Sequence, residues 1–408
     1  MHPYRALLTN PGFRRFWLGL MLVMLADEFV RTTLIWRLYV ITGSSEAVGL
    51  LMVCFTAPLI AGGLIAGPLL DRFPRARVMA ADATLRTTAL LLGAAILAAD
   101  PTAFLAQATL YVIAFIQGAL TMILLGGAPS AIAELVPPEH RSAANALEML
   151  AFTAGGALGP LIAGLLADHI PISGALLLAA LAYATFAVTI RAMPLGGGRP
   201  SNLAAKVNWR QSGVFQPSVA IITIMFFVIN IAGGAIGVFL PVIVDRGLGL
   251  GADTYGTLLA AIGIGGSVGA LVAGTFSDTA RLPAAVAATQ IAIGLALLPV
   301  IWTIATPVPS LTVTIICFFF FGLFSGPLTV WAQTIRMRFI APQWRGRAFA
   351  SMRMIMQSGR PVGGAIGGLA IAAMPIAPCL IAATATIILP AALALLHPAM
   401  NRPHPPAG

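Results

Sequence analysis

The sequence predicts an all-α membrane protein with about twelve transmembrane helices, arranged as two similar halves of six. Of its 408 residues, 59% are hydrophobic and 9% are charged, against roughly 25% charged in a soluble globular protein. Such a small share of charged groups cannot cover a surface that faces water. Lipid is therefore the solvent that fits this composition. Long apolar runs and motifs repeated between the halves support the same fold class.

The apolar runs are long enough to cross a membrane, which takes about 20 helical residues. In the first half the predicted spans are 16–41, 46–70, 78–99, 102–133, 143–167 and 171–192; in the second they are 218–244, 253–277, 283–305, 309–335, 347–373 and 375–396. The first run is too long for the apolar part of a signal peptide and lacks a small-residue cleavage site. We expect it to remain as the first span.

Arginine positions predict the orientation, because basic residues concentrate in cytoplasmic segments. With the amino terminus inside, the outer segments hold only Arg37 and Arg246. The inner segments hold Arg5, Arg14, Arg15, Arg72, Arg75, Arg77, Arg141, Arg191, Arg199, Lys206, Arg210, Arg281, Arg336, Arg338, Arg345, Arg347 and Arg402. We therefore expect a multi-pass protein of the cell inner (plasma) membrane with both termini in the cytoplasm.

The longest polar stretch, 194–217, predicts a cytoplasmic linker between an amino-terminal bundle, 1–193, and a carboxyl-terminal bundle, 218–408. The two halves carry matching residues. Gly67 and Asp71 recur as Gly274 and Asp278, an offset of 207; Pro138, Arg141, Gly155, Gly159 and Gly164 recur as Pro342, Arg345, Gly359, Gly363 and Gly368, an offset of 204. This pattern predicts a parallel repeat of six-helix halves, which is a known transporter architecture.

The loop after the second span carries a charged motif, Gly67-Pro-Leu-Leu-Asp71-Arg72-Phe-Pro-Arg75-Ala-Arg. Gly67 permits close approach of another helix, and Asp71 is placed to meet a helix amino terminus, a contact worth about 0.3 to 1 kcal/mol. Glu134 is the natural acidic partner of Arg72 or Arg75. The alternative is that these basic residues only anchor the protein at the inner membrane surface.

The fifth span carries a glycine ladder that ends in proline: Gly155, Gly159 and Pro160, followed by Gly164. Small residues four apart let helix backbones approach closely, and the proline removes one backbone hydrogen bond and permits a bend. The ladder serves either gating or tight packing alone.

These motifs resemble the major facilitator superfamily. The loop 67–77 is similar to its signature loop, with Pro74 where glycine is usual. The start of the first span, with Asn10, Pro11 and Trp17, and the ladder of the fifth look like the branch of drug and siderophore exporters, with Ala146 where a further glycine is usual. The resemblance implies two pseudo-symmetric six-helix bundles. It also implies that Asp71 contacts the start of the eleventh span as a cytoplasmic gate, to which Asp278 is the counterpart.

The first span carries Asp27, Glu28 and Arg31 near its middle. Each charge at this depth costs about 2.5 to 3.5 kcal/mol, so these side chains should face a water-filled cavity and pair with one another. One guanidinium would meet two carboxylates, and the surplus negative charge would raise proton affinity. The sequence predicts a site for proton coupling or a cationic substrate group. The alternative is a closed ion network that only holds the span in place.

Other polar residues are predicted at membrane depth. The expected cavity-lining residues are Gln117, Asn230, Gln333 and Gln357. Arg360 would bind an anionic substrate or a carboxylate from the first or fifth span. Glu148 is either a second proton site or a partner of an inner arginine. Asp82 and Arg86, four residues apart on the third span, are interpreted as a mainly structural pair.

Several function classes are disfavoured. All five histidines fall in loops or tails, so a histidine-ligated metal site is not expected, although Asp27 and Glu28 alone could attract a hard cation. The net charge of +10 is scattered rather than gathered on one face, which disfavours nucleic-acid binding. We find no phosphate-binding glycine loop and no paired nucleophile and base, so neither an enzyme nor a cofactor is expected.

The sequence therefore predicts a monomeric, proton-coupled exporter of a small amphipathic molecule, such as a drug or siderophore, that works by alternating access. Its partners would be the substrate, protons and the lipid bilayer. Uptake by proton symport would use the same acids with the opposite coupling. From another class, a non-transporting membrane sensor or an intramembrane enzyme remains as an alternative.

Overall fold

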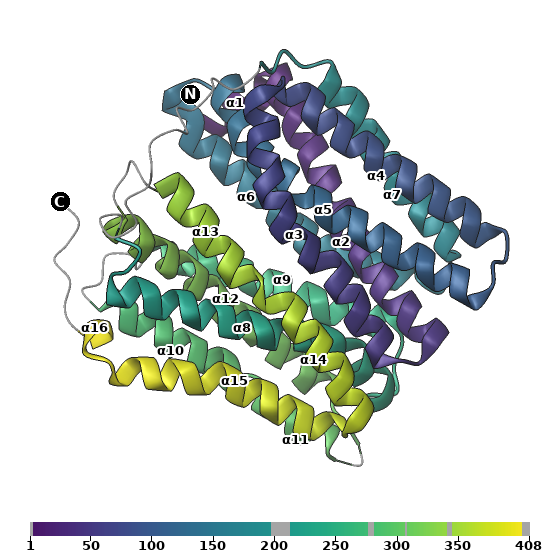
Figure 1. Cartoon of the computed structure of the whole chain (residues 1–408), viewed down its shortest axis with the longest axis vertical. Helices are drawn as coiled ribbons and strands as arrows, with labels where there is room; N and C mark the ends of the chain where they lie inside the picture. Colours follow the sequence, from purple (N-terminus) through teal and green to yellow (C-terminus); the bar gives the residue numbers. More distant parts are fainter. Residues whose placement is uncertain (1–2, 197–212, 276–280, 307, 341–344, 402–408) are drawn as a thin grey trace. The chain divides into compact units, whose positions relative to one another are not determined.

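The computed structural model describes residues 3–196, 213–275, 281–306, 308–340 and 345–401, and its regular elements are helices joined mostly by short turns (Figure 1). The first part of the chain forms α1 (Pro3–Thr9), α2 (Pro11–Thr42), α3 (Ser45–Arg72), α4 (Arg75–Ala98), α5 (Ala103–Leu135), η1 (Pro138–His140), α6 (Arg141–Leu166) and α7 (Ile172–Arg191). The second part forms α8 (Pro217–Val242), η2 (Ile243–Gly247), α9 (Ala252–Thr275), α10 (Leu282–Leu295), α11 (Leu298–Ile304), α12 (Leu311–Phe339), α13 (Arg345–Gln357), α14 (Gly359–Ala373), α15 (Ile376–Leu396) and α16 (Pro398–Asn401).

Ten helical stretches in the described residues are long and apolar enough to cross a membrane, and they correspond to ten of the predicted spans. The other two predicted spans differ for identifiable reasons. The first lies in α2, whose middle carries the charges of Asp27, Glu28 and Arg31. The eleventh is divided between α13 and α14 at Ser358. Twelve crossings and cytoplasmic termini stay predictions.

The helices form two compact units. The first comprises Met1–Thr42 and Cys54–Ala204, and the second comprises Gly43–Val53 and Ala205–Gly408. The beginning of α3 is grouped with the second unit. The division into bundles 1–193 and 218–408 with a linker between them stays a prediction.

The same helix pairs pack together in both units. In the first unit α2 packs against α6 and α4 against α7; in the second, α8 packs against α14 and α10 against α15. Counted from the start of each half, these are the first and fifth spans and the third and sixth spans. The structure therefore repeats the helix packing, as the matching sequence motifs predict.

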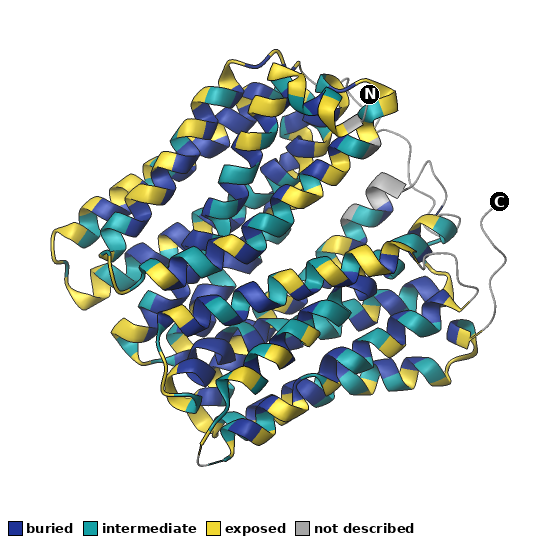
Figure 2. Ribbon diagram, turned by 180° about the vertical axis from the view of Figure 1, so that it is seen from behind, coloured by how far each residue is buried: buried dark blue, intermediate teal, exposed yellow. Residues whose placement is uncertain are grey.

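Figure 2 shows exposed positions along the helices of each unit, and many of these positions carry large apolar side chains. Val188 of α7 is 74% exposed, Leu271 of α9 is 77% exposed and Leu393 of α15 is 66% exposed. Such residues on so many helices would cause aggregation in water, whereas lipid chains solvate them. The outer faces of the units are suited to a bilayer.

Glycines allow the closest of these helix contacts. A Cβ atom built on Gly159 of α6 would lie 2.8 Å from the Leu25 carbonyl oxygen of α2, and one built on Gly155 would lie 2.7 Å from the Met24 carbonyl carbon. In the second unit, a Cβ atom on Gly363 of α14 would lie 1.8 Å from the Ile231 carbonyl oxygen of α8. The glycine ladders therefore pack each fifth helix against each first helix.

Replacing Gly159 by alanine tests this contact. The added methyl group would collide with the α2 backbone, so we expect the Gly159→Ala protein to lose about 1 to 3 kcal/mol of stability. Thermal unfolding of the purified protein in detergent measures the loss.

Gly156→Ala on the same helix is the matched control, because a Cβ atom built there meets no described atom within 4 Å. The midpoint temperature of its thermal unfolding should stay at or above that of the parent protein, since alanine favours a helix more than glycine does. Equal midpoints for both variants would contradict the ladder's packing role.

Candidate functional site

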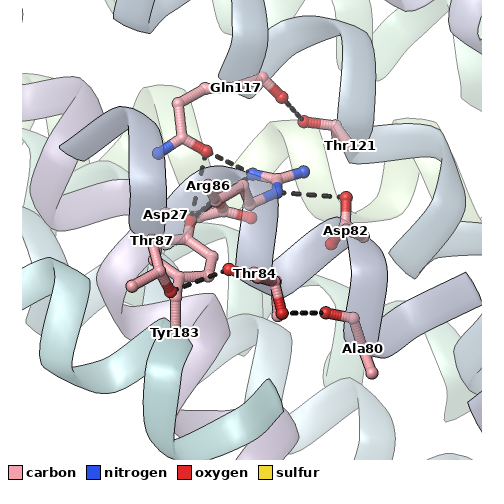
Figure 3. A network of polar contacts seen from close by, with 10 residues as sticks. Asp27, Ala80, Asp82, Thr84, Arg86, Thr87, Gln117, Thr121 and Tyr183 are labelled. Carbon is pink, nitrogen blue, oxygen red and sulfur yellow. Dashed lines mark hydrogen bonds and ion pairs between the residues drawn. The ribbon is translucent and has the colours of Figure 1, made fainter. Parts of the chain in front are cut away.

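Figure 3 shows Arg86 within a network of polar side chains in the first unit. Arg86 is in the middle of α4, and its side chain is 0% exposed. Helix α4 packs against α5 and α7, and α2 packs against both of those helices as well. A guanidinium stays protonated in proteins, so its positive charge has to be met by neighbouring groups.

Two carboxylates meet that charge. Arg86 Nη1 donates to Asp27 Oδ1 of α2 at 2.8 Å, and Arg86 Nε donates to Asp82 Oδ1 on its own helix at 3.2 Å. The Asp82 side chain is 2% exposed and that of Asp27 is 16% exposed. With all three groups ionised, the site carries one surplus negative charge.

Two neutral side chains complete the network. Tyr183 of α7 donates its hydroxyl to Asp27 Oδ1, and its ring centre lies 5.4 Å from Arg86 Cζ. Gln117 of α5 accepts from Arg86 Nη1 with its side-chain oxygen. Four helices of one unit therefore each contribute a group to the same cluster, which fixes the position of the carboxylates.

Two donors of this network lack a partner within the described chain. Arg86 Nη2 and Gln117 Nε2 are buried and make no hydrogen bond there. A buried unsatisfied donor costs about 1 to 3 kcal/mol, so such groups normally bind water or a ligand. The cluster is therefore able to take a further acceptor as well as a proton.

The structure corrects the predicted pairing on α2. Arg31 Nη2 pairs with Glu28 Oε1 at 3.2 Å, and Asp27 pairs with Arg86 instead of Arg31. Adjacent residues point about 100° apart on a helix, so Asp27 faces α4 and α7 while Glu28 and Arg31 lie together on another part of the surface. One guanidinium does meet two carboxylates, but it is Arg86, and its second partner is Asp82.

The charged loop motif forms part of a second cluster. Glu134 of α5 forms an ion pair with Arg75, which is one of the two partners expected for it. Its other oxygen accepts from the Gly196 backbone N–H at 2.9 Å, and the Arg75 backbone N–H donates to the Gly196 carbonyl at 3.0 Å. The loop is thereby fixed to α5 and to the segment after α7, within the first unit.

The remaining members of the predicted gate are placed differently. Arg72 lies over the Phe73 ring, with Cζ 5.7 Å from its centre. Asp71 is half-buried without an ion pair among the described residues. A Cβ atom on Gly67 would meet no described atom within 4 Å. Asp278 lies outside the described residues.

Pro160 and Gly164 of the ladder are both buried within a continuous α6, and the Gly164 carbonyl accepts from Ala167 N–H at 3.2 Å. Glu148, on the same helix, is half-buried and makes no hydrogen bond or ion pair within the described chain. Arg141 donates instead to the Ala133 carbonyl, so the predicted Glu148 partner on that side is not observed.

In the second unit, Arg360 Nε of α14 donates to Asn230 Oδ1 of α8 at 2.9 Å. The structure thus brings together two of the polar residues predicted at depth. Gln333 and Gln357 are half-buried, and neither side chain makes a hydrogen bond within the described part of the chain.

Sequence reasoning missed three groups. Asp82 and Arg86 were given a mainly structural role and Tyr183 was not singled out, yet all three belong to the network that holds Asp27. The sequence did indicate a larger role, because Arg86 lies in the middle of a predicted span. An isolated i,i+4 ion pair is costly at that depth in the membrane. Within the described residues, no group of three His, Cys, Asp or Glu side chains is arranged to hold a metal ion.

The family follows from comparison with known proteins. A family model described as Major Facilitator Superfamily matches residues 16–364 and 222–407. The chain belongs to the major facilitator superfamily. It is accordingly a multi-pass membrane transporter, and members of this superfamily carry small molecules, often together with protons.

One relative and two solved structures illustrate the similarity. An uncharacterized MFS-type transporter, y4rN, of Sinorhizobium fredii (strain NBRC 101917 / NGR234) is 28% identical over 90% of each chain. The crystal structure of a point mutant of the nucleoside transporter NupG matches with a TM-score of 0.75 at 11% identity, over 93% of this chain and 99% of that one. A bacterial homolog of the human lysosomal transporter Spinster, inward-facing and occupied, gives 0.69 at 15% identity, over 97% of both chains. At these identities the solved structures show the fold alone.

Removing Arg86 tests the network. Arg86→Gln would leave two buried carboxylates without their counter-charge, so we expect a loss of about 3 to 5 kcal/mol. Arg31→Gln is the control, because its guanidinium is 39% exposed and its pair is worth at most about 1 kcal/mol. Thermal unfolding in detergent compares the two.

Adding Asp82→Asn to Arg86→Gln removes one of the stranded charges and should recover part of the lost stability. A double variant no more stable than Arg86→Gln would contradict the charge argument.

Proposed function

We propose that this transporter is a proton-coupled exporter of a small amphipathic molecule, such as a drug or siderophore, working by alternating access. The observation that supports it is the surplus carboxylate of the Asp27, Asp82 and Arg86 network. Exporter motifs on α2 and α6 favour the outward direction. We further propose twelve crossings of the inner membrane, cytoplasmic termini and a monomeric working unit.

The network suits a proton carrier because its charge balance changes with one proton. With both aspartates ionised, the cluster is negative by one and binds a proton or the cationic group of a substrate. With one aspartate protonated, Arg86 and the other carboxylate neutralise each other. Asp27 is the group we assign to exchange, because its side chain is 16% exposed whereas Asp82 is 2% exposed.

Tyr183 and Gln117 have positioning roles in this proposal. Both share oxygen contacts with the Asp27 and Arg86 pair, so they can hold the guanidinium in place when the carboxylate takes up a proton. The Glu28 and Arg31 pair balances its own charge. We assign it to substrate selection, as a more exposed polar contact beside the proton site.

The cytoplasmic gate is proposed to comprise Gly67, Asp71, Arg72, Arg75, Glu134 and Asp278. The contact between Arg75 and Glu134 supports a fixed loop in the first unit, against which the other members act. Gly155, Gly159, Pro160 and Gly164 are proposed to allow α6 to move against α2 without losing contact.

Everted membrane vesicles test the proposal. A pH gradient is established by respiration, and a panel of amphipathic compounds is added one at a time. An exporter that exchanges protons for substrate should dissipate the gradient when its substrate is added. A symporter for uptake would be revealed by proton-driven accumulation in right-side-out vesicles, and a sensor would give no flux in either preparation.

We expect Asp27→Asn and Glu28→Gln to differ. Asp27→Asn removes the exchanging carboxylate, so proton-coupled flux should fall at least a hundredfold while counterflow of substrate without a gradient persists. Glu28→Gln should mainly raise the substrate concentration for half-maximal flux. Reconstituted proteoliposomes measure both quantities.

The folded fraction of each variant, from size-exclusion chromatography, provides the control. Equal proton-coupled rates in the two variants and the parent would show that the proton site lies elsewhere.

A further inference from the structure

A buried arginine in the second unit contacts neutral groups. Arg336 lies in the last turn of α12 and is 6% exposed. Its Nε donates to the Ala332 carbonyl at 3.1 Å, and its Nη1 lies 3.5 Å from Met356 Sδ of α13. Its Cζ lies 5.5 Å from the centre of the Phe226 ring of α8. None of these groups carries a negative charge.

The second unit has few carboxylates that could supply one. The chain from 279 to 408 contains no Asp or Glu. Glu46 and Asp253 lie in the first turns of α3 and α9, Asp245 lies in η2, and Asp278 lies outside the described residues. The described residues place no carboxylate within ion-pair distance of Arg336. A guanidinium does not lose its proton, and a buried charge without a counter-charge is unfavourable. An anion brought to Arg336 by a ligand would therefore be stabilised there.

The internal repeat shows that packing alone does not require this arginine. The offset of 204 that relates Pro138 to Pro342 and Gly155 to Gly359 relates Ile132 to Arg336. Ile132 is 2% exposed, so the same position in the first unit is filled by an apolar side chain. The second unit therefore has a charged side chain at a position where the same fold accommodates isoleucine in the first unit.

A second guanidinium approaches the same turn of α8. Asn230 Nδ2 donates to the Phe226 carbonyl at 2.7 Å, and Asn230 Oδ1 accepts from Arg360 at 2.9 Å. Arg353 lies three residues before Met356 on the same helix, α13. Arg336 and Arg360 therefore both contact α8, at Phe226 and Asn230, and Arg353 lies on the helix that carries Met356.

The repeat also shows how the two units differ in charge. Gly155 of α6 faces Met24, and Gly359 of α14 faces Phe227. Three residues further along each partner helix stand Asp27 in the first unit and Asn230 in the second. The carboxylate that balances Arg86 therefore has a neutral amide as its counterpart, so the second unit lacks the acid that the first unit places at this position.

We propose that Arg336, Arg353 and Arg360 bind an anionic group of the transported molecule, a carboxylate, sulfonate or phosphate. The Phe226 ring and the Met356 thioether provide an apolar surface for the rest of that molecule, so an aromatic organic anion is the class that fits. The inference rests on the proposed transport function but not on its direction or its proton coupling.

Binding of a matched probe series to the full chain tests this inference. The probes are naphthalene-2-carboxylate, the uncharged naphthalene-2-carboxamide and the cationic naphthalen-2-ylmethylammonium, titrated calorimetrically into the protein in phosphatidylcholine nanodiscs. The carboxylate should bind at least tenfold more tightly than either analogue. Equal or weaker binding of the carboxylate would overturn the inference.

Two variants test whether these arginines cause the preference for the carboxylate probe. Arg336→Ile introduces the residue found at the repeat-related position, so it should fold while reducing the preference for the carboxylate at least tenfold. Arg246→Gln is the control, because it removes the same charge at a residue that donates to the Gly43 carbonyl. An unchanged preference in Arg336→Ile, or an equal loss in Arg246→Gln, would contradict the assignment.

A final arm separates a substrate anion from a lipid headgroup. The titration is repeated in nanodiscs that contain phosphatidylglycerol, whose phosphate carries an uncompensated negative charge. Carboxylate binding should change less than threefold; a tenfold loss would assign the arginines to lipid and overturn the substrate inference. Proton flux in everted vesicles is independent of these titrations, so failure of the anion site and failure of the exporter proposal are distinguishable.

Discussion

The first unit depends on how a permanent positive charge is accommodated between apolar helices. Arg86 is 0% exposed and cannot lose its proton, so the helices around it have to provide acceptors. Asp27, Asp82, Gln117 and Tyr183 do so from four helices of the unit (Figure 3). Because all four side chains contact Arg86, the network adds directional contacts to the apolar packing of α2, α4, α5 and α7.

The same cluster has an unbalanced charge. A closed pair of one guanidinium and one carboxylate would be neutral and inert, whereas a second carboxylate leaves the cluster responsive to a proton. The glycine contacts of α6 place its backbone against α2 beside Asp27 and Glu28, with a Gly159 Cβ position 2.8 Å from the Glu28 Cβ atom. The proposed movement of α6 would therefore act on the helix that carries the carboxylate.

Much of the fold could be predicted from sequence because its signals are local. Apolar runs between charges located the helices, and repeated glycines and prolines indicated two related halves. The first span is predicted despite its mid-helix charges and lies in α2, whereas the division of the eleventh span at Ser358 is not predicted. The need of Asp27 for a positive partner could be predicted from the cost of a charge at depth. Its partner could not, because the contact with Arg86 joins residues 59 positions apart and depends on which face of α2 meets α4.

The repeat explains how one scaffold supports opposite charges in its two units. Contacts between backbones, such as those of Gly155 with Met24 and Gly359 with Phe227, fix the packing without using side-chain chemistry. Positions beside those contacts are then free to differ, as Asp27 and Asn230 do. The first unit holds a surplus carboxylate and the second holds several guanidinium groups, so in the proposed carrier the proton and the substrate would not compete for one residue. In such a carrier, Asp27 would exchange the proton and the arginines of the second unit would select for an anionic group, so substitutions in one cluster would change one property while leaving the other.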